Sequence, residues 1–228
     1  MGDMMYKVYG DILSGNCYKI KLILQFLGIE HEWEHVDILA GETHTERFIK
    51  INPNERIPAM QIEEGIYLSE SNAILNYLAD GSAFLPGDKL GRSRVLRWQF
   101  FEQYSHEPYI ATARYINKYL GLPEDRKEEY YSKQSGGHKA LKIMDDHLRD
   151  NAYFLGGFPT IADISLYAYT HVAHEGGFEV GEYRNILRWF GDFERIPGYI
   201  KMERGNAVKS EAGFISSGPR DCNARPVR

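Results

Sequence analysis

The chain has 228 residues, of which 43% are hydrophobic and 26% charged, enough to bury a substantial core in one large domain or two smaller ones. Its net charge of −5 at pH 7 argues against nucleic-acid binding, which favours a basic face. No apolar run reaches the roughly 18 residues that span a bilayer, and the first residues lack the basic start of a signal peptide, so we expect a cytoplasmic protein that does not bind membranes.

The first predicted elements are a strand over residues 5–9 and a helix over residues 15–27, which ends at Gly28. Apolar residues recur at helical spacing in the second segment, and Ser14 stands directly before it. The first backbone N–H groups of a helix lack intrahelical partners, and the helix dipole presents its positive end there. Ser14 therefore suits the role of an N-cap, and a negative group close to it would be stabilised.

The two cysteines predict neither a disulfide framework nor a metal site. Cys17 shares the apolar face of the predicted helix with Ile20 and Leu24, so we expect a buried thiol. Cys222 lies in a polar tail. Cysteines in these places suit a reducing compartment and give no reason to expect a bound metal.

Strand and helix patterns alternate up to about residue 80. After the first helix we expect a strand over 31–36, a short helix over 45–50, strands over 59–62 and 66–68, and a helix over 70–78. Residues 63–65 include Gly65 and predict a hairpin turn between the last two strands. The predicted order is thus β-α-β, α, β-β-α.

The remainder of the chain is almost wholly helical in pattern. We expect a long helix over 92–119 that Pro108 bends or interrupts, a helix over 124–148 weakened by Gly136 and Gly137, and a helix over 185–194. Thr160 and Asp163 have the spacing of a capping box, which opens a further helix. We therefore divide the chain into an α/β domain over 1–81, a linker over 82–89, an all-helical domain over 90–205 and a loosely held tail over 206–228.

Four separated segments resemble the glutathione S-transferase family, in the order in which that family carries them. They are YGDILSGN at 9–16, NPNERIP at 52–58, LSESNAI at 68–74 and IAD at 161–163. The first is similar to the active-site corner of the serine-type members, especially the phi-like and bacterial groups. Over residues 5–205 the resemblance implies a thioredoxin-like N-terminal domain and an all-helical C-terminal domain.

The resemblance also implies which residues bind glutathione. A cis peptide bond before Pro58 would turn the backbone of Ile57 toward the cysteinyl part, as an added strand pairs with a sheet edge. The residues alone leave a trans proline open, because only about 5–6% of X-Pro bonds in folded proteins are cis. Glu70 would hold the ammonium group, and Ser71 would offer a hydroxyl and a backbone N–H to the γ-glutamyl carboxylate. For the glycyl carboxylate, the candidates by position are Thr43, His44 and Arg56.

Ser14 becomes the predicted catalytic residue in such a site. A free thiol has a pKa of about 8.5, and lowering it by about two units requires about 2.7 kcal/mol of preferential stabilisation of the thiolate. A helix N-terminus supplies about 0.3–1 kcal/mol, and a hydrogen bond to a charged group supplies about 1.5–3 kcal/mol. We therefore expect the Ser14 hydroxyl to donate to the glutathione sulfur, with Asn16 either donating in support or orienting the turn.

The second substrate should meet the thiolate between the two domains. Aromatic residues gather on the long predicted helix, and we expect Tyr104, Tyr109 and Arg114 to contribute to an electrophile pocket. Most aromatic residues at helical spacing are core residues, and the sequence does not separate the two roles.

Together these features predict a cytoplasmic glutathione transferase, active in detoxification, that joins glutathione to a small hydrophobic electrophile. The resemblance implies a homodimer with glutathione as co-substrate and no metal. Two alternatives stay open: a glutathione-dependent disulfide or peroxide reductase, and a non-catalytic glutathione-binding or protein-interaction module on the same fold. The physiological electrophile is not predicted, because a fold does not specify the shape of a pocket.

Overall fold

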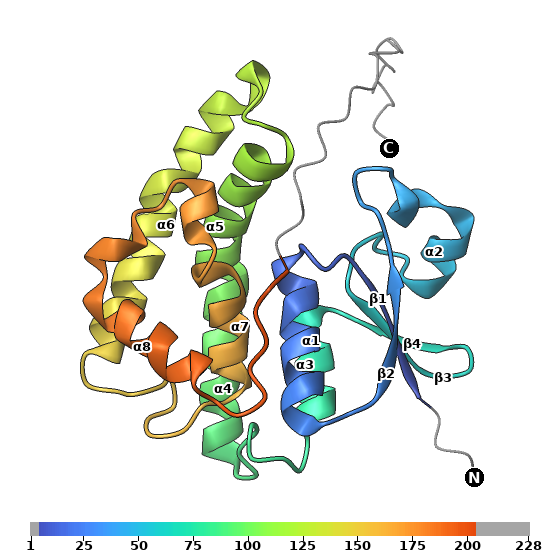
Figure 1. The fold of residues 1–228 in the computed structure, drawn as a ribbon, viewed down its shortest axis with the longest axis horizontal. Coiled ribbons are helices and arrows are strands. Elements are labelled where there is room, and N and C mark those ends of the chain that lie inside the picture. Colours follow the sequence, from blue (N-terminus) through green and yellow to red (C-terminus); the bar gives the residue numbers. More distant parts are fainter. Residues whose placement is uncertain (1–4, 204–228) are drawn as a thin grey trace, which may run out of the picture.

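The computed structural model describes residues 5–203, which form an α/β unit beside a group of helices (Figure 1). The α/β unit contains β1 (Tyr6–Gly10), α1 (Gly15–Leu27), β2 (His31–His35), the 3-10 helix η1 (Glu42–His44), α2 (Glu46–Ile51), β3 (Ala59–Glu63), β4 (Ile66–Ser69) and α3 (Ser71–Ala79). This order confirms the predicted thioredoxin-like arrangement, and the bounds differ from the prediction by no more than one residue.

One sheet of four strands has the order β2-β1-β3-β4, with β1 parallel to β2 and antiparallel to β3. Alternation along β1 directs Val8 into the main core with residues of α1 and α3. Tyr9 lies on the opposite face, in a smaller cluster with Phe48 and Ile51 of α2. Because helices cover both faces, the strand ends at Gly10 in a buried position, close to where α1 begins (Figure 1).

The second unit is helical, as predicted. Its elements are α4 (Lys89–Phe101), the π-helix η2 (Glu102–His106), α5 (Glu107–Arg114), the π-helix η3 (Tyr115–Tyr119), the 3-10 helix η4 (Glu124–Arg126), α6 (Lys127–Leu148), α7 (Ile161–Thr170), the 3-10 helices η5 (Ala173–Gly176) and η6 (Val180–Glu182), and α8 (Arg184–Glu194). The predicted tail over 206–228, with Cys222, lies outside the described residues.

The long helix predicted over 92–119 is present as four consecutive pieces, α4, η2, α5 and η3. Pro108 does not interrupt it, because the helix first widens into a π turn in which the N–H of Glu107 bonds to the carbonyl of Glu102. Pro108 then lies in the first turn of α5, a position that tolerates proline.

Gly136 and Gly137 do not break α6, because each faces an aromatic ring at very close range. A Cβ on Gly136 would lie 2.2 Å from Cε1 of Tyr109, and one on Gly137 would lie 2.2 Å from Cε1 of Phe178. The two glycines therefore allow α5 and the segment after η5 to approach α6 closely.

Helix α7 lies at the centre of the molecule, and every one of its residues is buried. It opens with the predicted capping box, in which the Asp163 carboxylate accepts from the Thr160 N–H at 2.8 Å. Asp163 also accepts from the indole N–H of Trp189 at 3.1 Å, which attaches α8 to the same cap. A single apolar core runs from α1 and α3 through α7 to α8, so the two units pack against each other as one body.

Residues after α8 return across α1 (Figure 1). The Tyr18 hydroxyl donates to the carbonyl of Ile200 at 2.6 Å, and Lys21 pairs with Glu203. No helix within residues 5–203 is long and apolar enough to cross a membrane.

Candidate active site

The corner between β1 and α1 places Ser14 as an N-cap, as its sequence position predicts. Its backbone is extended, and its Oγ accepts from the N–H of Cys17 at 3.4 Å. The cap uses the oxygen only as an acceptor, so the hydroxyl hydrogen stays available for donation. Cys17 is buried as predicted, and burial raises the pKa of its thiol to about 12. A thiol with so high a pKa is protonated at neutral pH, so Cys17 is a poorer candidate than Ser14 for the reactive group of this corner.

Residues of the helical unit hold the corner between β1 and α1 in place by hydrogen bonds to the backbone carbonyl of Leu13. Arg114 donates to this oxygen from Nη1 at 2.9 Å, and the Tyr119 hydroxyl donates to it at 2.7 Å. The guanidinium is buried and is itself fixed by Glu175, whose carboxylate accepts from Arg114 Nε at 2.6 Å. Two donors saturate the Leu13 carbonyl, so the peptide that precedes Ser14 has a defined orientation.

Both the oxygen and the nitrogen of the Asn16 side-chain amide form hydrogen bonds within the protein. Its Oδ1 accepts from the Ser71 hydroxyl at 3.0 Å, and its Nδ2 donates to Glu107 Oε1 at 2.9 Å. Ser71 in turn accepts from Lys19 Nζ at 3.3 Å. These bonds favour the orienting role for Asn16, and they leave the backbone N–H of Ser71 as its donor toward a ligand.

A polar pocket of about 260 Å³ adjoins the corner. Six of the sequence-predicted residues line it: Asn16, Arg56, Ile57, Pro58, Glu70 and Ser71. The Ile57–Pro58 peptide bond is cis, as the resemblance implied. Four further residues line the pocket that sequence reasoning missed: Asn52, Asn54, Gln103 and Glu107.

Glu70 has an unusual backbone conformation at this pocket. Its φ of 68° and ψ of 111° lie outside the regions that non-glycine residues prefer, which costs about 1–3 kcal/mol. The residue directly precedes Ser71, the first residue of α3. Strain at a polar residue that lines a pocket indicates a functional constraint, since α3 could begin after an unstrained residue.

A buried charged cluster lies behind the pocket. Lys19 Nζ is 2.9 Å from Glu102 Oε1 and 3.9 Å from Glu107 Oε2. The side chains of Lys19 and Glu102 are fully buried, and that of Glu107 is 23% exposed. Burial, and next the charge of Glu102, raise the pKa of Glu107. A lysine between apolar helix neighbours, Tyr18 and Ile20, was the one sequence signal that pointed to this cluster.

Two predicted glutathione contacts lie outside the pocket. Thr43 is buried in η1, and His44 is exposed and pairs through Nδ1 with the carboxylate of Glu55. Arg56 is the only cationic residue among those that line the pocket.

The three residues predicted for an electrophile pocket are not brought together. Tyr104 is 78% exposed and lines a hollow between α3 and α4, which shares Glu70 and Gln103 with the polar pocket. Tyr109 packs on Gly136, and Arg114 lies under Leu13. The three residues therefore face different neighbours along this helix.

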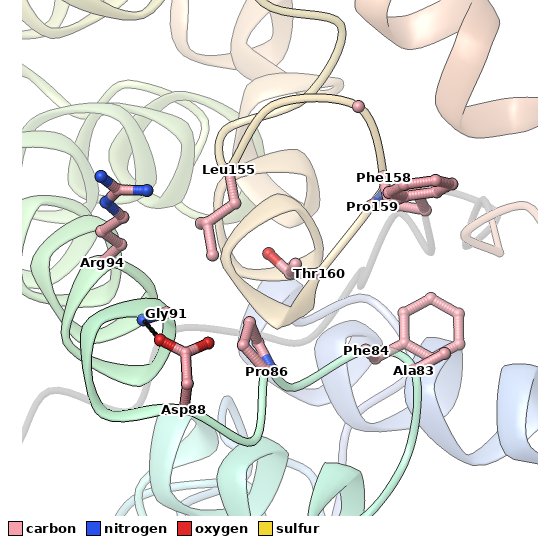
Figure 2. A pocket seen from close by; sticks show the side chains of 11 residues that line it. Ala83, Phe84, Pro86, Asp88, Gly91, Arg94, Leu155, Phe158, Pro159 and Thr160 are labelled. Atoms are coloured by element: carbon pink, nitrogen blue, oxygen red, sulfur yellow. Dashed lines mark hydrogen bonds between the residues drawn. The ribbon is translucent and has the colours of Figure 1, made fainter.

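A further apolar hollow of about 490 Å³ lies far from the corner. Figure 2 shows Leu155, Phe158 and Pro86 around it, with Arg94 at one side. Phe84, which also lines it, stacks on Phe26 in the last turns of α1, at the opposite end of that helix from Ser14. None of the sequence-predicted site residues lines this hollow.

Comparisons with known proteins agree with the predicted family. The family model described as the glutathione S-transferase N-terminal domain matches residues 4–80, and the C-terminal domain model matches residues 98–197. A glutathione S-transferase domain-containing protein of Dictyostelium discoideum is 32% identical, over 93% of this chain and 83% of its own length.

Solved structures of similar proteins show the same fold. A glutathione S-transferase from Pseudomonas fluorescens Pf-5 is 55% identical with a TM-score of 0.86, over 87% of this chain and 99% of that one. A glutathione transferase family member from the same organism, solved with two glutathione molecules bound, is 26% identical with a TM-score of 0.75, over 85% and 90% of the two chains.

Proposed function

Because the chain belongs to the glutathione S-transferase family and is an enzyme of that type, we propose that it joins the thiolate of glutathione to a small hydrophobic electrophile. The observation that carries this proposal is the 260 Å³ polar pocket beside the N-terminus of α1. Residues 1–81 are assigned to glutathione binding and residues 90–205 to the electrophile. The glutathione-bound relative supports the choice of co-substrate.

Each end of glutathione has a complementary group in this pocket. The backbone N–H and C=O of Ile57, exposed by the cis bond before Pro58, suit the cysteinyl part. The N–H of Ser71 at the start of α3 suits the γ-glutamyl carboxylate, and Glu70 suits the ammonium group. Arg56 suits the glycyl carboxylate, a better choice than Thr43 or His44, which lie outside the pocket.

Ser14 acts as the hydrogen-bond donor to the sulfur. Its oxygen is held by the Cys17 N–H, and its free hydrogen meets a thiolate at the positive end of α1. The thiol proton passes to solvent, and the sulfur then forms a bond to carbon of the electrophile. In a displacement the leaving group departs with the electron pair of its own bond; in a conjugate addition the carbanion takes a proton from water.

Asn16 and Leu13 position this donor. Asn16 is fixed between Ser71 and Glu107, and Leu13 is fixed by Arg114 and Tyr119. These bonds fix the residues on both sides of Ser14, which itself is not among the residues that line the pocket.

We assign the enzyme to the cytoplasm, where glutathione is abundant and reduced, and to detoxification. We also propose that it is a homodimer. Leu96, Phe100 and Tyr104 form an apolar row on successive turns of one helix face, at 42%, 58% and 78% exposure. Such a row is rare on a monomer. It borders the hollow of about 520 Å³ against α3, which shares Glu70 and Gln103 with the glutathione pocket.

Two assays on the purified full chain test the proposal. Glutathione binding is measured by calorimetry, and turnover is measured with a chlorinated aromatic, a small disulfide and a peroxide. Turnover of the chlorinated aromatic supports conjugation. Turnover of the disulfide or peroxide alone would establish a reductase, and binding without any turnover would establish a binding module.

A further inference from the structure

The apolar hollow of about 490 Å³ beside Leu155 is separate from the proposed active site. It shares no lining residue with the polar pocket at the start of α1. One of its lining residues, Phe84, stacks on Phe26 with the ring centroids 5.2 Å apart. Ser14 caps the start of α1 and Phe26 lies in its last turn, so about 18 Å of helix separate them. A molecule in this hollow therefore lies well away from the proposed thiolate.

Three segments form the walls of this hollow, and hydrogen bonds hold each of them in place. The carbonyl of Phe84 in the linker accepts from the first N–H of α7 at 3.0 Å. Asp88 caps α4 by accepting from the N–H of Gly91 at 2.9 Å. The loop before α7 is attached through the N–H of Phe154, which donates to Asp163 Oδ1 at 3.0 Å. The hollow is therefore preformed, as small-molecule sites usually are.

The walls of the hollow carry flat apolar side chains on two sides. Figure 2 shows Phe158 and Pro159 of the loop before α7 on one side, and Phe84 and Pro86 of the linker on the other. Phe158 is 81% exposed, so its ring is available to a ligand. Rings on two sides favour a planar aromatic ligand, because offset stacking adds to the burial of apolar area.

Arg94 supplies a positive charge at one side of the hollow (Figure 2). Within residues 5–203 its guanidinium has no carboxylate at salt-bridge distance, whereas the nearby Arg92 pairs with Asp80. Asp88, the other charged residue of the lining, stands at the N-cap of α4, about 9 Å of helix away from Arg94. An anionic group is therefore favoured at the Arg94 side of the hollow and disfavoured at the Asp88 side.

We propose that this hollow is a second ligand site of the protein, for a small planar aromatic compound that carries one carboxylate. The ring lies between the loop before α7 and the linker, and the carboxylate pairs with Arg94. Charge complementarity selects this class over a neutral aromatic compound, and the flat apolar walls select it over a wholly polar anion. The proposal does not depend on glutathione, because the hollow and the polar pocket have no residue in common.

Calorimetry with 2-naphthoate and its neutral counterpart 2-naphthamide tests the proposal on the purified full chain. Saturating S-hexylglutathione is present throughout, so that the glutathione pocket and its surroundings are occupied. We expect about one molecule of 2-naphthoate to bind per chain, with a Kd between about 10 μM and 1 mM. 2-Naphthamide has the same ring without the charge and should bind about threefold to fivefold more weakly, the size of an exposed ion pair.

Two variants with matched controls locate the binding. Arg94→Gln should abolish the preference for naphthoate, whereas Arg97→Gln on the same helix, outside the hollow, should keep it. Phe158→Ser should weaken binding of both compounds by about fivefold, because it removes an aromatic wall. Tyr131→Ser removes an exposed ring of α6 outside the hollow and should leave both Kd values unchanged. All of these positions are exposed, so we expect the variants to fold.

Three results would overturn the proposal: no binding of 2-naphthoate by the wild type at millimolar concentration, binding that S-hexylglutathione abolishes, or an unchanged preference in Arg94→Gln. If Phe158→Ser lowered the mass of the protein in light scattering, the hollow would be an interface between two copies of the chain, which would also overturn it. Failure of the wild type to bind S-hexylglutathione would contradict the proposed function alone, since the Arg94 and Phe158 variants would still decide where 2-naphthoate binds.

Discussion

Arg114, the last residue of α5, donates from Nη1 to the backbone carbonyl of Leu13 at 2.9 Å, across 101 positions of the sequence. Leu13 directly precedes the cap residue Ser14. Since Glu175 fixes the guanidinium from its other side, the helical unit holds the corner at a point next to the proposed catalytic hydroxyl. The geometry of the corner therefore depends on both units.

Arg114→Met should lower turnover about tenfold with a smaller change in KM for glutathione, because losing one hydrogen bond of roughly 1–1.5 kcal/mol loosens the corner. Steady-state kinetics over a range of pH, with thermal unfolding to verify folding, measure this effect. Lys118→Met is the matched control, since Lys118 pairs with the same Glu175 but does not contact Leu13. Equal losses in the two variants would argue against a role of the Leu13 contact.

Ser14→Ala should lower turnover by about tenfold to a hundredfold while glutathione affinity stays within a few-fold. The variant removes the proposed donor to the sulfur, so the pKa of the bound thiol should rise by about one to two units, visible in the pH dependence of kcat and in thiolate absorbance. The N-cap loss itself costs about 1 kcal/mol of stability.

Ser14→Thr separates these two effects, because it keeps both the hydroxyl and the cap. It should recover much of the turnover and the lower thiol pKa. A Ser14→Ala enzyme with a wild-type rate and pH profile would exclude Ser14 from the mechanism.

Lys19→Met should lower the free energy of unfolding by about 3–5 kcal/mol, because it leaves Glu102 buried without its partner and strengthens the charge imbalance at Glu107. Denaturant unfolding measures the loss. Lys21→Met, two residues along the same helix, removes the exposed pair with Glu203 and should change stability by less than about 1 kcal/mol.

The double variant Lys19→Met with Glu102→Leu checks the cause. Replacing both members of a buried pair by apolar residues is often close to neutral, so the double variant should be more stable than Lys19→Met alone. A double variant that is less stable than Lys19→Met would show that Lys19 does not stabilise the fold through its ion pair with Glu102.

Much of the fold followed from local patterns. The alternation around Val8 and the helical spacing after Ser14 each reflect one buried face, so the order of elements and most bounds were predicted correctly. The sequence placed an irregularity at Pro108 but did not reveal its form, a π turn over Glu102–His106 directly before α5. The sequence also did not reveal that the rings of Tyr109 and Phe178 fill the space beside Gly136 and Gly137.

The structure brings Ile57, Pro58, Glu70 and Ser71 to one pocket, because each of them belongs to a local sequence motif. Glu107 and Lys19 were missed, because their roles depend on which charges meet between α1 and α5 after folding. No local pattern encodes such a pairing between residues so distant in the chain.

His106 should make the protein sensitive to acid. It is fully buried, and its pKa is lowered from 6.5 to about 3, chiefly by burial. The unfolded chain therefore binds more protons than the folded one between these values, so stability falls as pH drops below about 6.5. At pH 5 the loss from this group is about 2 kcal/mol relative to pH 7.

Unfolding by denaturant at several pH values measures the slope. His106→Asn should flatten the fall in stability between about pH 6.5 and 4, whereas His174→Asn, at an exposed position, should not. A slope that is the same in His106→Asn and in the wild type would show that other groups cause the acid sensitivity.

Phe100→Glu should convert the proposed dimer into monomers. Phe100 is 58% exposed at the middle of the apolar row that Leu96 and Tyr104 complete on one helix face. In a symmetric dimer each substitution acts twice, so two buried charges would oppose association. Light scattering coupled to size-exclusion chromatography should show the halved mass.

Phe158→Glu is the matched control for this change. Phe158 is even more exposed, at 81%, and lies at the other large hollow (Figure 2). If the row on α4 and η2 is the interface, this second variant should keep the wild-type mass. If Phe158→Glu were monomeric and Phe100→Glu still dimeric, the interface would lie at the hollow beside Leu155. If the wild type itself were monomeric, the proposal of a homodimer would be wrong.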